Sequence, residues 1–123
     1  MARAADLQET VTVRLKRTAQ SLALRAVVAR SWRARMVGLL GHAKLEDGEA
    51  MVFPGCGAIH TVGMRFAIDV IFTDRAWRIV SLRARVTPGR LAVLGRRAWA
   101  VIEAAEGTIE RFALQVGDEL DLD

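Results

Sequence analysis

The chain has 123 residues, of which 52% are hydrophobic and 26% are charged, and its formal net charge at pH 7 is +4. This length suits one domain with its own hydrophobic core, and the composition excludes a disordered or fibrous protein. The single cysteine, Cys56, excludes an intramolecular disulfide. No apolar stretch approaches the roughly 20 residues that cross a bilayer, so we expect a soluble, cytoplasmic protein with no membrane span.

Residues 1–21 are expected to form an N-terminal extension that contains one strand candidate. Apolar and polar residues alternate from Thr10 to Leu15, a pattern typical of a strand with one buried face. Residues 22–123 are expected to form a single β-rich domain, because no linker, repeat or low-complexity segment divides them. The first strand candidate of this domain covers residues 22–29.

Residues 31–41 carry the signals of a helix. Ser31 can cap the N-terminus, apolar residues recur at helical spacing, and Gly41 can end the helix in the left-handed conformation. A second short helix is expected to follow Gly107.

Short strand candidates alternate with turn signals along the rest of the chain. The expected strands are residues 50–54, 66–73, 77–86, 91–94, 98–103 and 117–122. Pro88 and Gly89 suit the two central positions of a type II turn. Because strands joined by tight turns pair in antiparallel fashion, the predicted fold class is mainly β. We expect an antiparallel, jelly-roll-like sandwich or barrel with one or two short helices.

Five motifs occur in an order that resembles a known prokaryotic family. The motifs are RARMVGLL at 33–40, AMVFP at 50–54, IHTVGMRFAIDVIF at 59–72, AVIEAAEG at 100–107 and VGDEL at 116–120. On these residues the chain resembles the family called domain of unknown function 192, over about residues 22–122. The resemblance implies a jelly-roll-like β-sandwich with a packed helix, and it implies no established activity.

Two positions depart from the pattern of the family that the chain resembles. Ala67 stands where proline is common, so the entry to the following strand is less rigid here. His60 stands where many relatives carry tryptophan, which argues against an indispensable catalytic role for this histidine. The same resemblance makes the loop that contains His60 a stronger candidate for the functional site.

The loop of residues 56–66 and the adjoining strand ends form the predicted site of a binding module for a small ligand or a protein. The loop concentrates polar side chains between glycines. The candidate ligand-binding residues are His60, Thr61, Met64, Arg65, Asp69 and Glu103.

Asp69 interrupts an otherwise apolar strand, so its carboxylate needs hydrogen-bond partners or a place in a cleft. The candidate partners in a structural clamp are Arg65, Arg35 and the backbone amides of the loop. The alternative is a carboxylate that faces a ligand. Glu103, at the end of another apolar strand, could then join Asp69 as an acid/base pair.

A small hydrolytic enzyme is the alternative function, with His60 acting together with Asp69 or Cys56, since a thiolate nucleophile needs a nearby base. The sequence does not decide whether the protein is an enzyme. Cys56, His60 and Met64 recur every four residues, but glycines interrupt any helix and the chain has only two histidines. We therefore expect no metal site and no cofactor.

A further alternative is an interaction surface on the arginine-rich region between Arg75 and Arg97. Nucleic acid is not the expected partner, because the chain has no tyrosine and only three tryptophans on which bases could stack. Any binding to DNA or RNA is expected to be weak and unselective.

Overall fold

The computed structural model describes residues 9–30 and 45–123. Its strands are β1 (Glu9–Leu15), β2 (Gln20–Val28), β3 (Gly48–Pro54), β4 (Ala58–Ile59), β5 (Ile68–Thr73), β6 (Ile79–Val86), β7 (Val93–Leu94), β8 (Ala100–Ala105) and β9 (Leu120–Leu122). One four-residue helix, α2 (Thr108–Arg111), precedes β9. The helix expected at residues 31–41, including Arg35, lies outside the described residues. The prediction of a mainly β fold is confirmed.

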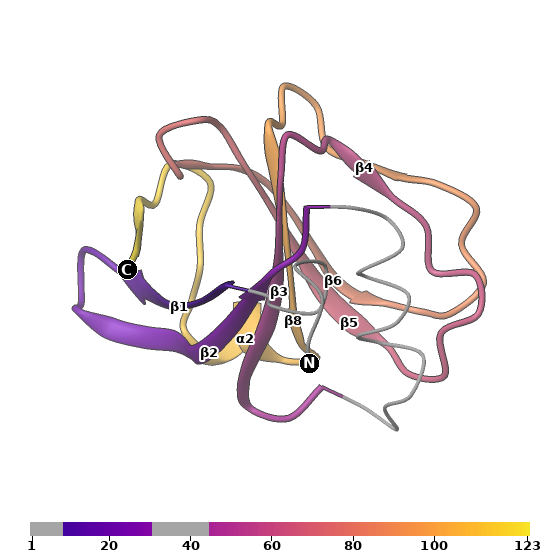
Figure 1. The fold of residues 1–123 in the computed structure, drawn as a ribbon, viewed down its shortest axis with the longest axis horizontal. Helices are drawn as coiled ribbons and strands as arrows, with labels where there is room; N and C mark the ends of the chain where they lie inside the picture. Colours follow the sequence, from indigo (N-terminus) through magenta and orange to yellow (C-terminus); the bar gives the residue numbers. More distant parts are fainter. Residues whose placement is uncertain (1–8, 31–44) are drawn as a thin grey trace, which may run out of the picture.

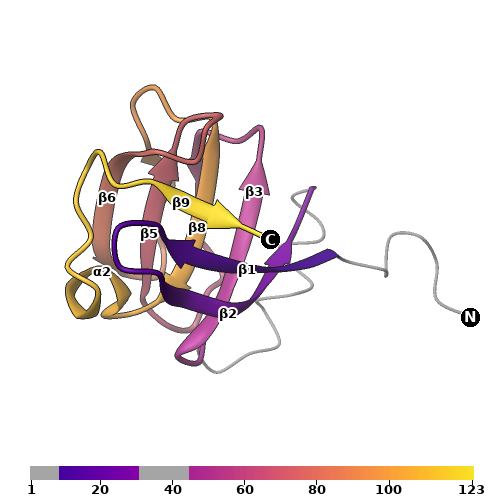
Figure 2. The same ribbon diagram turned by 90° about the vertical axis from the view of Figure 1, so that its left-hand side faces the viewer.

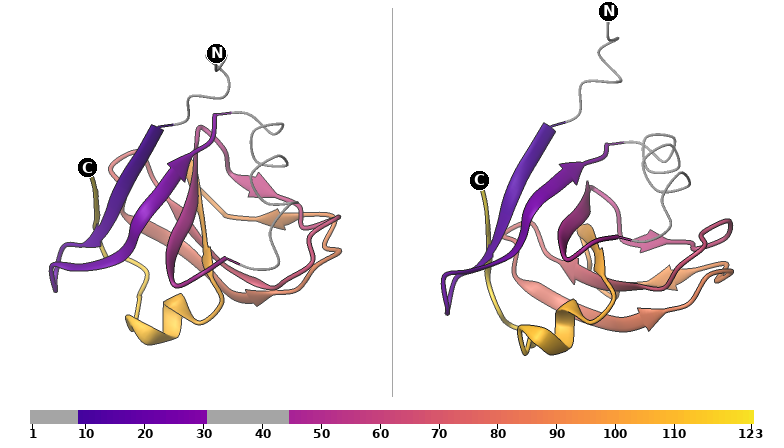
Figure 3. Two further views of the ribbon diagram at one scale, coloured as in Figure 1. Left: turned by 60° about the horizontal axis from the view of Figure 1, so that its bottom comes forward. Right: turned by 90° about the horizontal axis from the view of Figure 1, so that it is seen from below.

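Seven strands form one sheet in the order β6-β5-β8-β3-β2-β1-β9, and β4 pairs with β7 in a separate two-stranded ribbon (Figure 1). The large sheet curls over itself, because β1, β2 and β9 cross in front of β5 and β8 (Figure 2). Figure 3 shows α2 next to β6 and apart from the β4–β7 ribbon. No helix in the described part of the chain is long and apolar enough to span a membrane.

One strand pair differs from the expected antiparallel arrangement. β2 and β3 run parallel, with Ala26 opposite Ala50 and Val28 opposite Val52. Parallel neighbours need a crossover connection of roughly a dozen residues or more. Residues 29–47, which connect these two strands, are long enough for such a crossover.

Buried side chains form two clusters on the two faces of the sheet. Cluster A lies inside the curl and contains, among others, Val13, Leu15, Leu22, Ala26, Ile71, Ile102 and Leu120. Cluster B lies on the opposite face and contains, among others, Phe53, Ile59, Met64, Ile68, Val70, Phe72, Val93 and Val101. Because successive strand residues point to opposite faces, β5 contributes Ile71 to cluster A and Phe72 to cluster B. The β4–β7 ribbon covers cluster B through Ile59 and Val93.

Most strand candidates are found close to their expected positions, with two differences that both concern the β4–β7 ribbon. The strand expected at 91–94 is reduced to Val93–Leu94, and its two-residue partner Ala58–Ile59 is too short to leave a periodic pattern. Gly89 has a φ of 88°, the conformation that a type II turn requires after Pro88.

Candidate functional site

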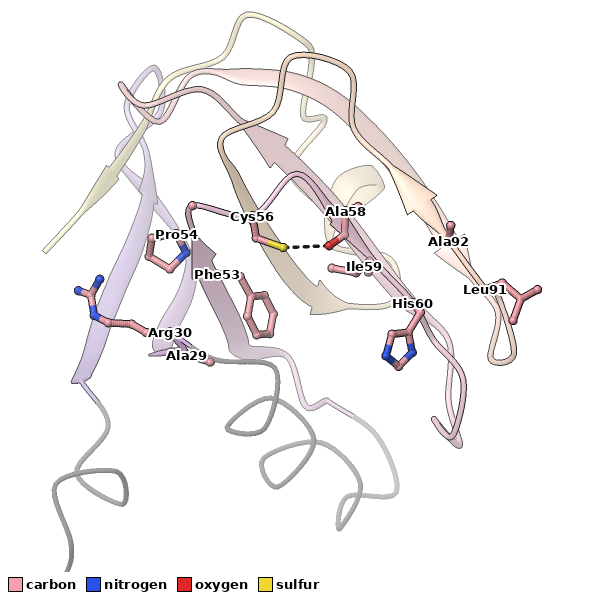
Figure 4. A pocket seen from close by; sticks show the side chains of 11 residues that line it. Ala29, Arg30, Phe53, Pro54, Cys56, Ala58, Ile59, His60, Leu91 and Ala92 are labelled. Carbon is pink, nitrogen blue, oxygen red and sulfur yellow. Dashed lines mark hydrogen bonds between the residues drawn. The ribbon is translucent and has the colours of Figure 1, made fainter.

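The loop after β3 changes direction at Gly55, whose φ of 71° lies in the left-handed region. The next residue, Cys56, is held by its backbone amide, which donates to the Trp99 carbonyl at 2.8 Å. Its thiol donates to the carbonyl of Ala58 at 2.9 Å (Figure 4). These bonds turn the chain into β4, where Ala58 lies opposite Leu94.

Thr61 joins this loop to the turn after β6. Its side chain is fully buried; the hydroxyl donates to the Thr87 carbonyl at 2.8 Å and accepts from the Arg90 amide at 2.9 Å. The Thr61 amide donates to the Arg90 carbonyl, and its carbonyl accepts from Gly89. The geometry therefore places Thr61 inside a loop-to-loop connection.

A pocket of about 420 Å³ opens beside this connection. Its walls come from the ends of β2 and β3, the loop that leads into β4, and the turn after β6. The lining residues are Ala29, Arg30, Phe53, Pro54, Gly55, Cys56, Ala58, Ile59, His60, Leu91 and Ala92. Figure 4 places the Phe53 ring between Arg30 on one side and His60 on the other. The pocket is thus mainly apolar, with two nitrogen-bearing side chains on opposite sides.

The described lining of the pocket includes no carboxylate. Arg30 contacts Glu9 with an N–O distance of 3.3 Å, and the two side chains are 72% and 57% exposed. An ion pair this exposed is weak and exchanges readily with other partners. The electrostatic character of the pocket is therefore cationic at its Arg30 side.

Asp69 does not line the pocket. It is fully buried; one carboxylate oxygen accepts from the backbone amide of Arg85 at 2.9 Å and the other from that of Ile109 at 2.8 Å. The donors are backbone amides of β6 and α2, whereas the sequence offered the backbone of the preceding loop and the guanidinium groups of Arg65 and Arg35 as alternatives. Arg65 is exposed.

The strand register separates the two buried carboxylates. Asp69 lies directly opposite Ala104, while Glu103 lies opposite Val70. Opposed residues share a face and successive residues alternate, so Asp69 and Glu103 point to opposite faces of the sheet. The geometry does not bring them together as an acid/base pair.

Cys56 and His60 are the only predicted site residues that the structure brings to the pocket among the residues it describes. Met64 is 7% exposed and packs in cluster B. Within residues 9–30 and 45–123, no three His, Cys, Asp or Glu side chains gather in a way that could hold a metal ion.

Sequence reasoning missed the walls that lie far from the loop. Phe53 and Leu91 were assigned only to strands. The sequence carried one weak signal, since Leu91 is an apolar residue that follows the turn at Pro88 and Gly89. In the structure Leu91 is 86% exposed. A single exposed leucine is common on protein surfaces, so only its position at the pocket distinguishes it.

The fold and site define a single-domain class of mainly β proteins, with a curled sheet and an apolar pocket between a loop and a turn. A model of the family described as "Uncharacterized ACR", domain of unknown function 192, matches residues 13–122. The chain belongs to this family.

A relative from Pyrococcus furiosus, named as a UPF0127 protein, is 38% identical over 64 residues. The alignment spans 52% of this chain and 54% of that protein, about half the length of each.

Two solved structures share the fold. A Sinorhizobium meliloti protein described as a candidate transcription regulator has a TM-score of 0.79 at 18% identity, covering 98% of both chains. A Novosphingobium aromaticivorans protein of unknown function has a TM-score of 0.73 at 23% identity, covering 98% of this chain and 90% of that one. At these identities the likeness concerns the fold alone.

Proposed function

We propose that the pocket beside loop 56–66 binds a small amphipathic molecule with an apolar body and one anionic head group, such as a carboxylate. The observation that carries this proposal is the combination of a mainly apolar pocket of about 420 Å³ with Arg30 and His60 and no carboxylate in its described lining. This volume lies within the range of roughly 300 to 1,000 Å³ that is usual for small-molecule sites.

The apolar body of the ligand lies against Phe53, Ile59 and Leu91. Each methylene that it buries there contributes about 0.8 kcal/mol. Leu91 is 86% exposed in the free protein, so ligand binding removes an apolar surface from water.

The head group lies next to His60, whose imidazole always carries at least one N–H donor. Arg30 lies across the pocket, beyond Phe53 (Figure 4). Its charge attracts an anion to the opening without the need for direct contact. A neutral analogue of the same length is therefore bound more weakly.

Two observations favour binding over the hydrolytic alternative. The carboxylate of Asp69 is bonded to two backbone amides and lies outside the pocket, so it is not placed to orient His60 there. The thiol of Cys56 donates its proton to the Ala58 carbonyl, and a nucleophilic thiolate would have to give up this bond.

Calorimetric titration with octanoate and with octanol tests the proposal. We expect saturable binding of octanoate and weaker binding of octanol. Ala58→Phe, which fills the pocket from an exposed position, should abolish binding. The matched control is Ala76→Phe, a change of the same size at an exposed position in the hairpin before β6, and it should bind as the unmodified protein does.

Equal binding of octanoate by Ala58→Phe and Ala76→Phe would contradict the proposal, as would the absence of any saturable binding. Equal affinity for octanol and octanoate would show that the anionic head group does not contribute to binding. His60→Phe keeps a ring of similar size without a donor, and it should weaken octanoate binding while leaving octanol binding unchanged.

A further inference from the structure

β6 forms one end of the large sheet and pairs with a strand, β5, on one side only. The outer edge is occupied at its first residue, where Ile79 exchanges backbone hydrogen bonds with residues 117 and 118. After β6 the chain turns and returns as residues 90–97. Among the described residues, no backbone hydrogen bond joins this return segment to β6, because β7 within it pairs with β4 instead.

Two depressions follow one another along this outer edge. The first, of about 390 Å³, lies between residues 82–86 of β6 and residues 90–94 of the return segment. The second, of about 600 Å³, lies between residues 78–80 and residues 96–97, and residues 116–117 also line it. Because β6 and the return segment run in opposite directions, the two depressions lie one after the other between them. We call the two depressions together the β6 groove.

The β6 groove is strongly cationic. Six arginines line it: Arg78, Arg83, Arg85, Arg90, Arg96 and Arg97. No acidic residue appears in its described lining. Arg78 pairs with Glu119 at 3.2 Å and Arg85 with Glu110 at 3.1 Å, and all four side chains are at least 46% exposed. Such exposed ion pairs contribute little to stability, so the arginines can exchange these partners for the carboxylates of a ligand.

We infer that the outer edge of β6 docks an acidic peptide in extended conformation, as an added strand. An edge strand offers unpaired backbone groups to a further strand, and main-chain hydrogen bonds then supply affinity while side-chain pockets supply specificity. Guanidinium groups bind carboxylates with two parallel hydrogen bonds. The charge of the groove therefore selects acidic partners.

The geometry also sets the pattern of the partner. Successive side chains of an added strand alternate between two faces, and Leu82 and Leu94 line the first depression together with Arg83. A peptide that alternates acidic and apolar residues meets both kinds of side chain. Because the outer edge is occupied at Ile79, residues 80–86 of β6 remain. They extend about 23 Å at roughly 3.3 Å per residue, which sets the upper length of the paired segment at about seven residues.

Nucleic acid fits the same groove less well. Phosphates bind arginine, but single strands also need aromatic side chains on which bases stack. No aromatic residue is present in the described lining of either depression. The charge of the edge also discourages pairing between two copies of this chain, since both carry the same arginines.

Fluorescence anisotropy with a labelled seven-residue peptide of alternating glutamate and valine tests this inference at pH 7. We expect saturable binding. A peptide of the same sequence in which every backbone amide is N-methylated has no N–H to donate to a neighbouring strand, and it should bind at least about tenfold more weakly. A peptide of alternating lysine and valine should not bind.

The variant pair Arg83→Glu and Arg25→Glu provides the matched control in the protein. Both arginines are exposed strand residues without an ion pair in the described structure, and only Arg83 lines the groove. Arg83→Glu should weaken peptide binding about tenfold or more, and Arg25→Glu should leave it nearly unchanged.

Three results would overturn the inference: equal losses in the two variants, equal binding of the N-methylated peptide, or no binding at millimolar peptide. Tighter binding of a single-stranded or duplex oligonucleotide than of the peptide, lost in Arg83→Glu, would assign the groove to nucleic acid instead. The pocket beside loop 56–66 shares Ala92 with the groove but is lined by neither Arg83 nor Arg25. Octanoate binding there is expected to be the same in both variants, so failure of one proposal leaves the other intact.

Discussion

The buried carboxylate of Asp69 accepts a hydrogen bond of 2.9 Å from the backbone amide of Arg85. Arg85 lies where the register between β5 and β6 shifts, and its φ of 51° is unusual for a residue with a side chain. The second oxygen accepts from Ile109 in the first turn of α2. One carboxylate therefore connects β5, a bulge of β6 and the start of α2.

Replacement of Asp69 should destabilise the fold. Asp69→Ala leaves two partly buried amides without acceptors and should cost about 3 kcal/mol or more, since a hydrogen bond to a charged group contributes about 1.5 to 3 kcal/mol. Asp69→Asn keeps one acceptor and should cost about 1 to 3 kcal/mol. Urea denaturation measures both.

Asp121→Ala is the control for Asp69, because Asp121 is an exposed strand aspartate on β9 and its loss should change the free energy of unfolding little. An unchanged or raised stability of Asp69→Ala would assign this carboxylate to a functional role, where removal of a strained charge stabilises the protein.

Thr61→Val should loosen the connection between the loop and the turn after β6. The change keeps the side-chain shape but removes the hydroxyl that contacts Thr87 and Arg90, and it should cost about 1 to 3 kcal/mol. Amide hydrogen exchange should report faster exchange at Arg90. Thr10→Val, at an exposed strand position, should alter neither quantity; equal behaviour of the two variants would refute a structural role for Thr61.

Gly95→Ala should be destabilising because its new methyl group meets the Phe72 ring. A Cβ atom at this position would overlap the carbon atoms of the Phe72 ring, far inside van der Waals contact. Overpacking of this kind costs about 1 to 3 kcal/mol. Combination with Phe72→Leu should cost less than the sum of the two single changes, and strict additivity would argue against this contact.

The pair formed by Arg17 and Asp118 should make stability depend on pH. The hydrogen bond from Arg17 holds the pKa of Asp118 below its ordinary value of 3.8. A carboxyl group with a lowered pKa in the folded state contributes stability above its unfolded pKa and loses it as pH falls through the folded value. The difference in unfolding free energy between the unmodified protein and Asp118→Asn should therefore shrink below about pH 4. A difference that is constant or grows toward acid would contradict this assignment.

The sequence predicts the strands well where the pattern is local. The alternation in residues 10–15 indicates β1, which buries Val13 and Leu15 on one face. The nearly continuous apolar run in residues 66–73 indicates β5, which is buried on both faces. The parallel pairing of β2 and β3 was not predictable, because the local sequence pattern of a strand does not indicate which strand it pairs with or in which direction. The ribbon of β4 and β7 was not predictable either, because a strand of two residues is too short to show an alternating pattern.

The site was predictable only in part, for the same reason. The burial of Asp69 follows from its apolar neighbours, but its donors are 16 and 40 residues away along the chain. The pocket joins residues from three distant segments, and only the segment of Cys56 and His60 carried a polar pattern. Apolar walls such as Phe53 look the same in a sequence as core residues do.

The pocket is tested most directly by two-dimensional NMR of labelled protein titrated with octanoate. Amide signals of Gly55, Cys56, Ala58, His60 and Leu91 should shift together and saturate, and the same titration of Ala58→Phe should leave them in place. Saturating shifts confined to the arginines of the β6 groove, or no saturating shifts at millimolar octanoate, would contradict a ligand site beside loop 56–66.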